Sequence, residues 1–97
     1  MTRTAAEEAH SEYLDELQKL LHLQRDAARL QVAVGAVQTA AAELRKLDGF
    51  RVHQERADSL TWTLQDAHST LRDAAVVQEQ IVRAARAAWA EFGELAE

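Results

Sequence analysis

Apolar side chains recur along this chain at spacings that alternate between three and four residues, in two unbroken tracks. Tracks of this length predict helices that each carry a coiled-coil seam. No segment shows the alternation of apolar and polar residues that would predict a strand instead. The first track is Leu20, Leu23, Ala27, Leu30, Val34, Val37, Ala41 and Leu44. The second is Ala57, Leu60, Leu64, Ala67, Leu71, Ala74, Gln78, Ile81, Ala85, Ala88, Phe92 and Leu95.

The two tracks are out of phase, and the change of phase falls at Gly49. Arg45 and Lys46 precede this glycine, and cations are favourable at the negative end of a helix dipole. Glycine is also the usual residue after the last helical turn, because it adopts the left-handed conformation easily. We therefore predict a turn at 47–50, with Asp48 and Gly49 at its centre.

Thr4 followed by Glu7 forms a capping-box pattern, which marks the start of a helix. The sequence thus predicts one helix over about 4–46 and a second over about 51–95. The expected fold class is all-α, with 1–97 as a single domain folded into a long antiparallel helical hairpin. The competing arrangement is one nearly continuous helix that pairs with a second copy.

A fold about Gly49 places Ala27 near Leu71 and Leu30 near Ala67. Small side chains then face large ones, which is how facing layers interdigitate without voids. One alanine-rich seam buries little apolar area, however, while ordering each residue costs ~1–2 kcal/mol in backbone entropy. We therefore expect further helices to pack against the hairpin.

Apolar residues outside the main seam indicate where those helices would pack. The hypothesis is that two hairpins, identical or from a sister protein, form a four-helix bundle as a dimer. The alternative is that these residues only widen the internal seam. The predicted interface residues are Leu14, Leu17, Leu21, Val77, Val82 and Trp89.

Two side chains depart from the seam pattern. Gln78 is polar inside an apolar track, with Leu20 opposite, and a single polar seam residue can fix register or oligomeric state. The alternative is exposure at the edge of the bundle. Trp62 lies outside the seam, where it either packs over the other helix near Gly35 or contacts a partner.

The net charge is −5, with no proline, three glycines and no cysteine. This charge argues against a nucleic-acid partner, and the absence of cysteine excludes a disulfide frame. Residues 1–16 and 87–97 hold eight acidic side chains and one basic one. They meet at the open end of a hairpin, as a solvated tip or as a docking end for a basic partner. No apolar run approaches the ~20 residues of a membrane span, so we expect a soluble, cytoplasmic protein, with export left open.

Catalytic and metal-binding patterns are sparse. The Glu-x-x-His spacing of di-metal helical bundles occurs once, from Glu7 to His10. The sequence offers no serine–histidine pairing and no glycine-rich phosphate loop. We expect no enzyme activity, no catalytic residue, no cofactor and no metal site, and keep a carboxylate/histidine metal-binding bundle as the alternative from another class.

In layout the chain resembles the small helical-hairpin proteins of the Trp-x-Gly family, which are exported by the type VII pathway. Those proteins are about as long, lack cysteine and turn at a central Trp-x-Gly. The corresponding segment here is Leu47-Asp48-Gly49, which shares the glycine. The resemblance implies pairing into a four-helix dimer and, as an alternative function, a secretion-associated partner protein.

The function that the sequence favours is a non-catalytic helical interaction protein, such as an adaptor, a scaffold or an accessory subunit. It would act through homo- or hetero-oligomeric coiled-coil packing, and its expected partner is a second copy or a sister helical protein.

Overall fold

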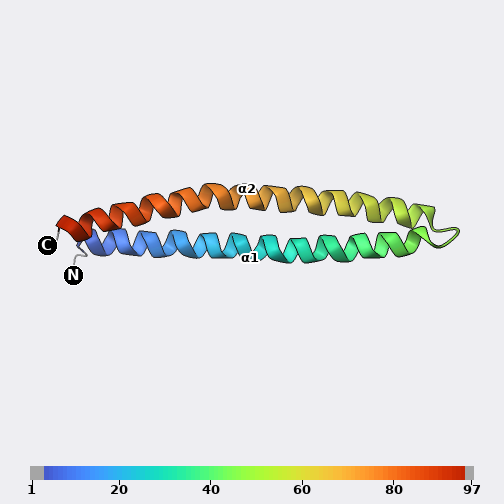
Figure 1. Cartoon of the computed structure of the whole chain (residues 1–97), viewed down its shortest axis with the longest axis horizontal. Coiled ribbons are helices and arrows are strands. Elements are labelled where there is room, and N and C mark those ends of the chain that lie inside the picture. The colour runs from blue at the N-terminus through green and yellow to red at the C-terminus, as the bar shows by residue number, and fades with distance from the viewer. Residues whose placement is uncertain (1–3, 96–97) are drawn as a thin grey trace. The chain divides into compact units, whose positions relative to one another are not determined.

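The computed structural model describes residues 4–95, with side chains described for 4–92. Two helices account for most of this range, α1 over Ala5–Arg45 and α2 over Arg51–Leu95. No strand occurs among the described residues. The helices run antiparallel and lie side by side (Figure 1). The predicted all-α helical hairpin is confirmed, and the helix bounds differ from the expected ones by at most one residue.

The connection between the helices is short and turns on one glycine. Gly49 has a φ of 84°, in the left-handed region, as the sequence predicts. The last turn of α1 tightens before it, because Lys46 N donates to Glu43 O and Leu47 N donates to Leu44 O, each at 3.1 Å. The turn therefore lies where the change of phase between the tracks places it.

The start of α1 is capped by Thr4. Its hydroxyl Oγ1 accepts a hydrogen bond from Glu7 N at 3.2 Å, and its carbonyl accepts one from Glu8 N at 3.1 Å. The first bond satisfies one of the backbone donors that a helix leaves unpaired at its N-terminus, and the second is the first regular hydrogen bond of α1. The threonine of the predicted capping box thus has the expected role.

Contacts within the chain divide it into two compact units, and each contains a stretch of both helices. Unit 1 comprises Met1–Gln24 and Asp73–Glu97, and unit 2 comprises Arg25–Arg72. Two paired helices produce this division because each level of the pair contacts only its neighbours. Unit 2 contains the turn, and unit 1 contains the paired segments nearest the termini.

The seam of α1 agrees with the predicted track. All eight members of that track are buried or partly buried. The seam also continues toward the N-terminus at the same spacing, through residues that the prediction did not include. These additional seam residues are Ala6, Ala9, Tyr13 and Glu16.

The seam of α2 departs from the predicted track at three of its alternate positions, whereas Ala67 and Ala74 are partly buried as predicted. Leu60, Ile81 and Ala88 are exposed, whereas Thr61, Val82 and Trp89 are buried or partly buried. Apolar residues flank the shared seam positions on both sides, so the spacing alone does not decide which flank faces α1. The predicted seam of α2 and the observed one share five positions, which are Ala57, Leu64, Leu71, Gln78 and Ala85.

Candidate interaction surface of unit 1

A polar layer crosses the seam of unit 1. Gln78 is only 9 % exposed, and its Nε2 donates to Glu16 O at 2.9 Å and to Glu16 Oε2 at 2.6 Å. Lys19 Nζ donates to Glu16 Oε1 at 2.9 Å. Burial of Gln78 shows that exposure at the bundle's edge was the wrong alternative. Its role in fixing register stays a prediction.

The hydrogen bonds of this layer favour its charged forms. The bond from Gln78, followed by the bond from Lys19, lowers the pKa of the Glu16 carboxyl, and desolvation opposes them. The bond to Glu16 and its charge raise the pKa of Lys19. Glu16 is not a member of the predicted α1 track. Its position four residues before Leu20, in phase with the track, is the signal that would have found it.

Trp89 belongs to the contact between the helices of unit 1. Its ring stacks on His10, with centroids 4.3 Å apart and 28° between planes, and on Tyr13, at 5.6 Å and 21°. Val82 is 8 % exposed and also lies in the seam. These two predicted interface residues therefore face α1, and for them the alternative, a wider internal seam, is the correct one.

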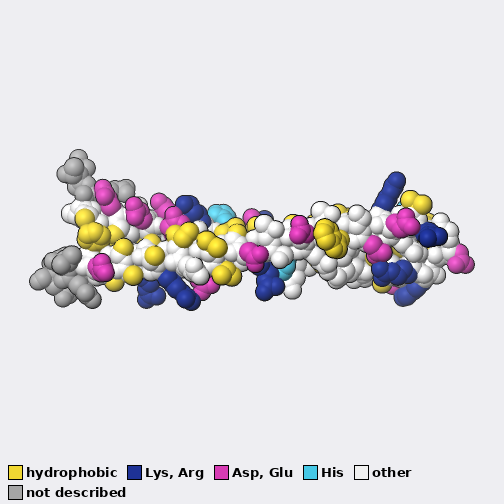
Figure 2. All heavy atoms as spheres, turned by 90° about the horizontal axis from the view of Figure 1, so that it is seen from above, with side chains coloured by type: hydrophobic (Ala, Val, Ile, Leu, Met, Phe, Trp, Pro, Cys, Tyr) yellow, Lys and Arg dark blue, Asp and Glu magenta, His cyan; other side chains and the backbone are white. Residues whose placement is uncertain are grey.

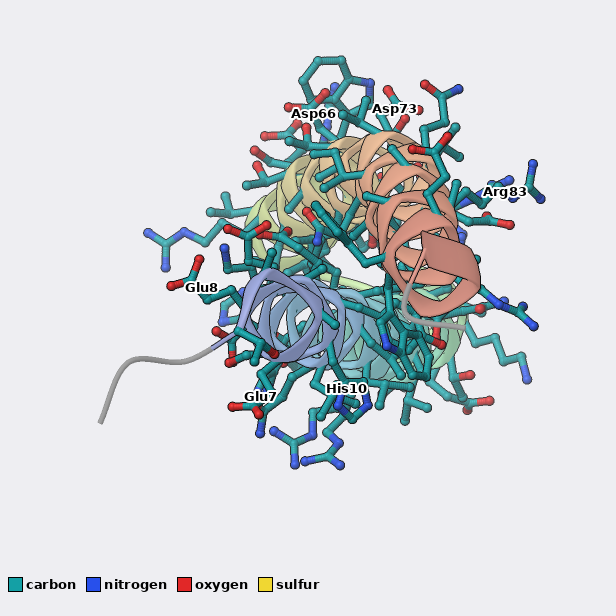
Figure 3. All side chains as sticks on the ribbon, turned by 90° about the vertical axis from the view of Figure 1, so that its left-hand side faces the viewer. Glu7, Glu8, His10, Asp66, Asp73 and Arg83 are labelled. Atoms are coloured by element: carbon teal, nitrogen blue, oxygen red, sulfur yellow. The ribbon has the colours of Figure 1, made fainter. Side chains whose placement is uncertain are left out.

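Positions relative to the seam show to which side of the pair a residue points. In an antiparallel pair, residues directly after seam residues face one side on both helices, and residues directly before them face the other. Arg45 NH2 and Asp58 Oδ1, 2.6 Å apart, illustrate the rule, because they follow the seam residues Leu44 and Ala57. In unit 1, Glu8 precedes a seam residue and Arg83 follows one, and they point to opposite sides (Figure 3).

An apolar row on α1 faces one of these sides. Leu14 and Leu21 are 48 % and 54 % exposed, and Leu17 between them is partly buried. Each directly follows a seam residue. We call these three residues the leucine row. It contains half of the predicted interface and is open to solvent in the single chain.

A second apolar row, on α2, faces the opposite side. Val77 is 58 % exposed and Ile81 is 43 % exposed. Together with Ala74, Ala84 and Ala88 they directly precede seam residues, and we call the five the α2 stripe. Apolar side chains form a band along the half of the molecule that unit 1 occupies (Figure 2). Val77, a predicted interface residue, is thus exposed, but on the other side from the leucine row.

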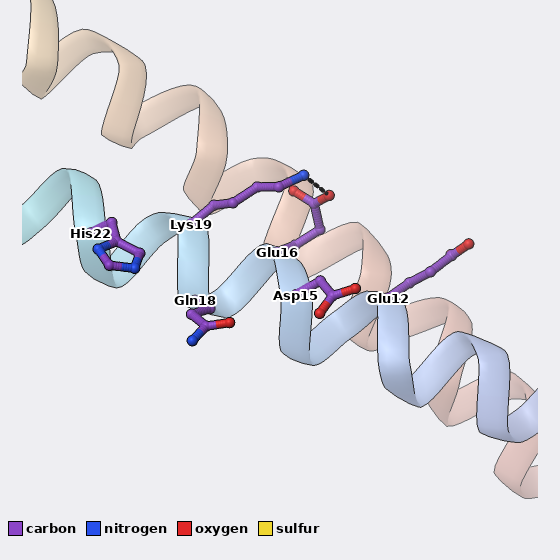
Figure 4. Close-up of a pocket in the computed structure, with 6 residues that line it drawn as sticks. All are labelled: Glu12, Asp15, Glu16, Gln18, Lys19 and His22. Carbon is purple, nitrogen blue, oxygen red and sulfur yellow. Dashed lines mark hydrogen bonds and ion pairs between the residues drawn. The ribbon is translucent and has the colours of Figure 1, made fainter.

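Acidic side chains of α1 lie on the same side as the α2 stripe. A shallow, open hollow of about 400 Å³ lies on this part of α1 (Figure 4). The Lys19–Glu16 pair lies at its edge, whereas Glu12 and Asp15 form no ion pair with a described residue. The hollow is lined by Glu12, Asp15, Glu16, Gln18, Lys19 and His22.

The structure also decides between the two expectations for Trp62. Its side chain is 71 % exposed, and a Cβ built on Gly35 would meet nothing within 4 Å. Packing of Trp62 over Gly35 was therefore wrong. Contact with a partner stays a prediction for this residue.

Within residues 4–92, no group of three or more histidine, aspartate or glutamate side chains is placed to hold a metal ion. His10, the histidine of the Glu-x-x-His pattern, stacks on Trp89. Neither described helix contains a segment apolar enough over sufficient length to span a bilayer.

Comparisons with protein families, with curated proteins and with solved structures found no match to this chain.

Proposed function

We propose that this chain is a non-catalytic helical interaction protein, acting as an adaptor, scaffold or accessory subunit. In this proposal two copies, or one copy and a sister helical protein, pair through the leucine row of unit 1. The result would be a four-helix bundle, in which the leucines of each hairpin are covered by helices of the other.

The observation that carries the proposal is the arrangement of apolar side chains in unit 1. Only Ala9, Leu20 and Val82 are buried hydrophobic residues among the described part of this unit. Leu14 and Leu21, which are larger than the alanine, are about half exposed and lie two helical turns apart on one side. A contiguous exposed apolar surface is typical of a protein–protein contact. Covering it would add the burial that a two-helix core lacks.

Sedimentation of the full chain at micromolar concentration tests the proposal. We expect the wild-type protein to sediment as a dimer, and the double variant Leu14→Glu/Leu21→Glu to sediment as a monomer. Pairing would bury the two glutamates, which would lose their hydration without gaining a cationic partner. The dimer of the variant is therefore disfavoured. Circular dichroism checks that the variant remains helical.

The matched control is Val32→Glu/Val52→Glu, which introduces the same charges at exposed valines of unit 2. This control should sediment as the wild type does. A folded wild-type chain that remains monomeric at these concentrations would contradict pairing between copies. Equal dissociation by both double variants would contradict the assignment of the contact to the leucine row.

A further inference from the structure

We infer that the opposite side of unit 1 binds a basic amphipathic helix of a partner protein. The apolar residues of that helix would lie on the α2 stripe, and its lysines and arginines would lie over acidic side chains of α1. The inference goes beyond the proposed function, because it concerns the side that the leucine row leaves free. It assigns the partner by chemistry rather than by identity.

The α2 stripe has the spacing of a second coiled-coil seam. Its members follow one another at three, four, three and four residues, from Ala74 to Ala88. Such a stripe presents one continuous row to a neighbouring helix. At 1.5 Å per residue the stripe extends over ~21 Å, about four turns of a partner helix. The three alanines of the stripe, Ala74, Ala84 and Ala88, allow that helix to approach closely.

The flank of the stripe on α1 is acidic. Glu8, Glu12 and Asp15 each directly precede a seam residue, so they face the same side as the stripe, and all three are exposed. None of them forms an ion pair with a described residue, whereas Lys19 on this side is held by Glu16. We call Glu8, Glu12 and Asp15 the acidic row. It supplies negative charge that no ion pair with a described residue compensates.

The charge of the whole unit has the same sign. Unit 1 carries ten acidic and four basic residues, whereas unit 2 carries six acidic and seven basic ones. Asp73 is exposed at the end of the stripe that lies farthest from the C-terminus. An approaching cationic helix is therefore attracted by the surroundings of the stripe as well as by the acidic row.

A second copy of this chain fits the stripe poorly. Two different two-fold arrangements would bring the stripes of two copies face to face. In one, the acidic rows of the two copies would lie against each other. In the other, each acidic row would lie against the flank of the other copy's α2 that contains Asp73. Like charges placed face to face disfavour such a contact. The same reasoning leaves the leucine row available to a second copy, because that row is on the other side of the pair.

The experiment uses the full-length chain and a pair of synthetic peptides of about 20 residues. The basic peptide has leucine at heptad positions a and d and lysine at e and g, and the acidic peptide has glutamate in place of each lysine. Each peptide carries a fluorophore, and binding is followed by anisotropy. We expect a Kd on the order of micromolar for the basic peptide and binding at least about tenfold weaker for the acidic one.

Two double variants locate the site. Glu12→Lys/Asp15→Lys should weaken binding of the basic peptide about tenfold or more, and Val77→Ser/Ile81→Ser should weaken it by a similar factor. The matched control Asp26→Lys/Asp66→Lys makes the same change of net charge in unit 2. It should change the Kd less than about threefold at physiological salt, where charges beyond ~8 Å are screened.

The leucine-row variant separates this inference from the proposed function. Leu14→Glu/Leu21→Glu should still bind the basic peptide, whether or not the wild-type chain forms dimers. Equal affinity for both peptides, or equal weakening by the two lysine double variants, would overturn the inference. So would dissociation of the wild-type dimer by Val77→Ser/Ile81→Ser, since the stripe would then be occupied by a second copy.

Discussion

The two units contain the same number of exposed large hydrophobic residues, six each among the described residues, but arrange them differently. In unit 1 most of them occur at helical spacing on one of two sides. In unit 2 three of them lie at or beside the turn, Val32 is isolated, and Leu60 and Trp62 are two residues apart and so point to different faces of α2. The unit 1 residues are Leu14, Leu21, Val76, Val77, Ile81 and Phe92. The unit 2 residues are Leu47, Phe50, Val52, Val32, Leu60 and Trp62.

The proposed contact surfaces depend on the arrangement of exposed apolar side chains rather than on their total area. Single exposed hydrophobic residues are common on protein surfaces and need no partner. Rows at helical spacing match the side chains of another helix and can be covered by it. For this reason both proposals concern unit 1.

Polar contacts differ between the units in the same way. In unit 1 the amide of Gln78 bonds to Glu16 within the seam. In unit 2 the contacts surround the turn, where Gln54 Nε2 donates to Leu44 O at 2.8 Å and Arg45 pairs with Asp58 at the surface. The first kind of contact joins the two helices within the seam, and the second lies beside the turn.

The two tryptophans, one in each unit, allow the comparison to be tested directly. Trp89→Ala should lower the free energy of unfolding by about 2 kcal/mol, because it removes a partly buried ring and its stacking on His10 and Tyr13. Trp62→Ala should change it by about 0.5 kcal/mol or less, since that ring is mostly exposed. Urea unfolding followed by circular dichroism measures both.

The tryptophan comparison requires equal protein concentrations, because association stabilises the folded state. Similar losses from the two substitutions would contradict the assignment of Trp89 to the internal contact. They would show instead that Trp62 is covered by another helix under the conditions of the measurement.

The two described glycines of unit 2 should respond to alanine with opposite signs. Gly49→Ala should destabilise the fold by about 1 kcal/mol, because an alanine at a φ of 84° is strained. Gly35→Ala should stabilise it by about 0.5–1 kcal/mol, because Gly35 is helical and exposed. An added Cβ meets nothing within 4 Å at either position, so sterics do not contribute. Thermal unfolding of the two variants gives the signs, and a stabilising Gly49→Ala would contradict the turn conformation.

The helices, the turn and half of the seam could be predicted from the sequence. The phase change located the turn, because it coincides with Gly49, the only glycine in that region. The α1 track was correct because the shifted spacing would place polar residues in the seam, namely Gln24, Gln31, Gln38 and Arg45. Thr4 was recognisable as a cap because its hydroxyl acts on the backbone of its own helix.

The side of α2 that faces α1 could not be predicted in the same way. Leu60 and Ile81 are as apolar as Val82, and they occur at equally regular spacing. The choice between them depends on which ring and which methyl groups fill the space left by α1, as Trp89 does against His10 and Tyr13. Because the spacing did not show which side of α2 faces α1, the six predicted interface residues lie partly in the seam and partly on two opposite sides of the pair.

The smallest predicted effect concerns the polar layer of unit 1 and its response to acid. Hydrogen bonds from Gln78 and Lys19 hold the pKa of Glu16 below its ordinary value of 4.5. A carboxyl whose pKa is lower in the folded chain stabilises the fold above that ordinary value, and the contribution disappears as the pH falls through the folded-state pKa. The wild-type chain should therefore lose more stability than Glu16→Gln as the pH is lowered from about 6 to about 3. Urea unfolding across this range measures the difference, with Asp66→Asn in unit 2 as the control for general charge effects. Parallel curves of the free energy of unfolding against pH for the wild type and Glu16→Gln would show that the layer does not favour the carboxylate. The polar contact in the seam of unit 1 would then differ from the surface contacts of unit 2 only in its position.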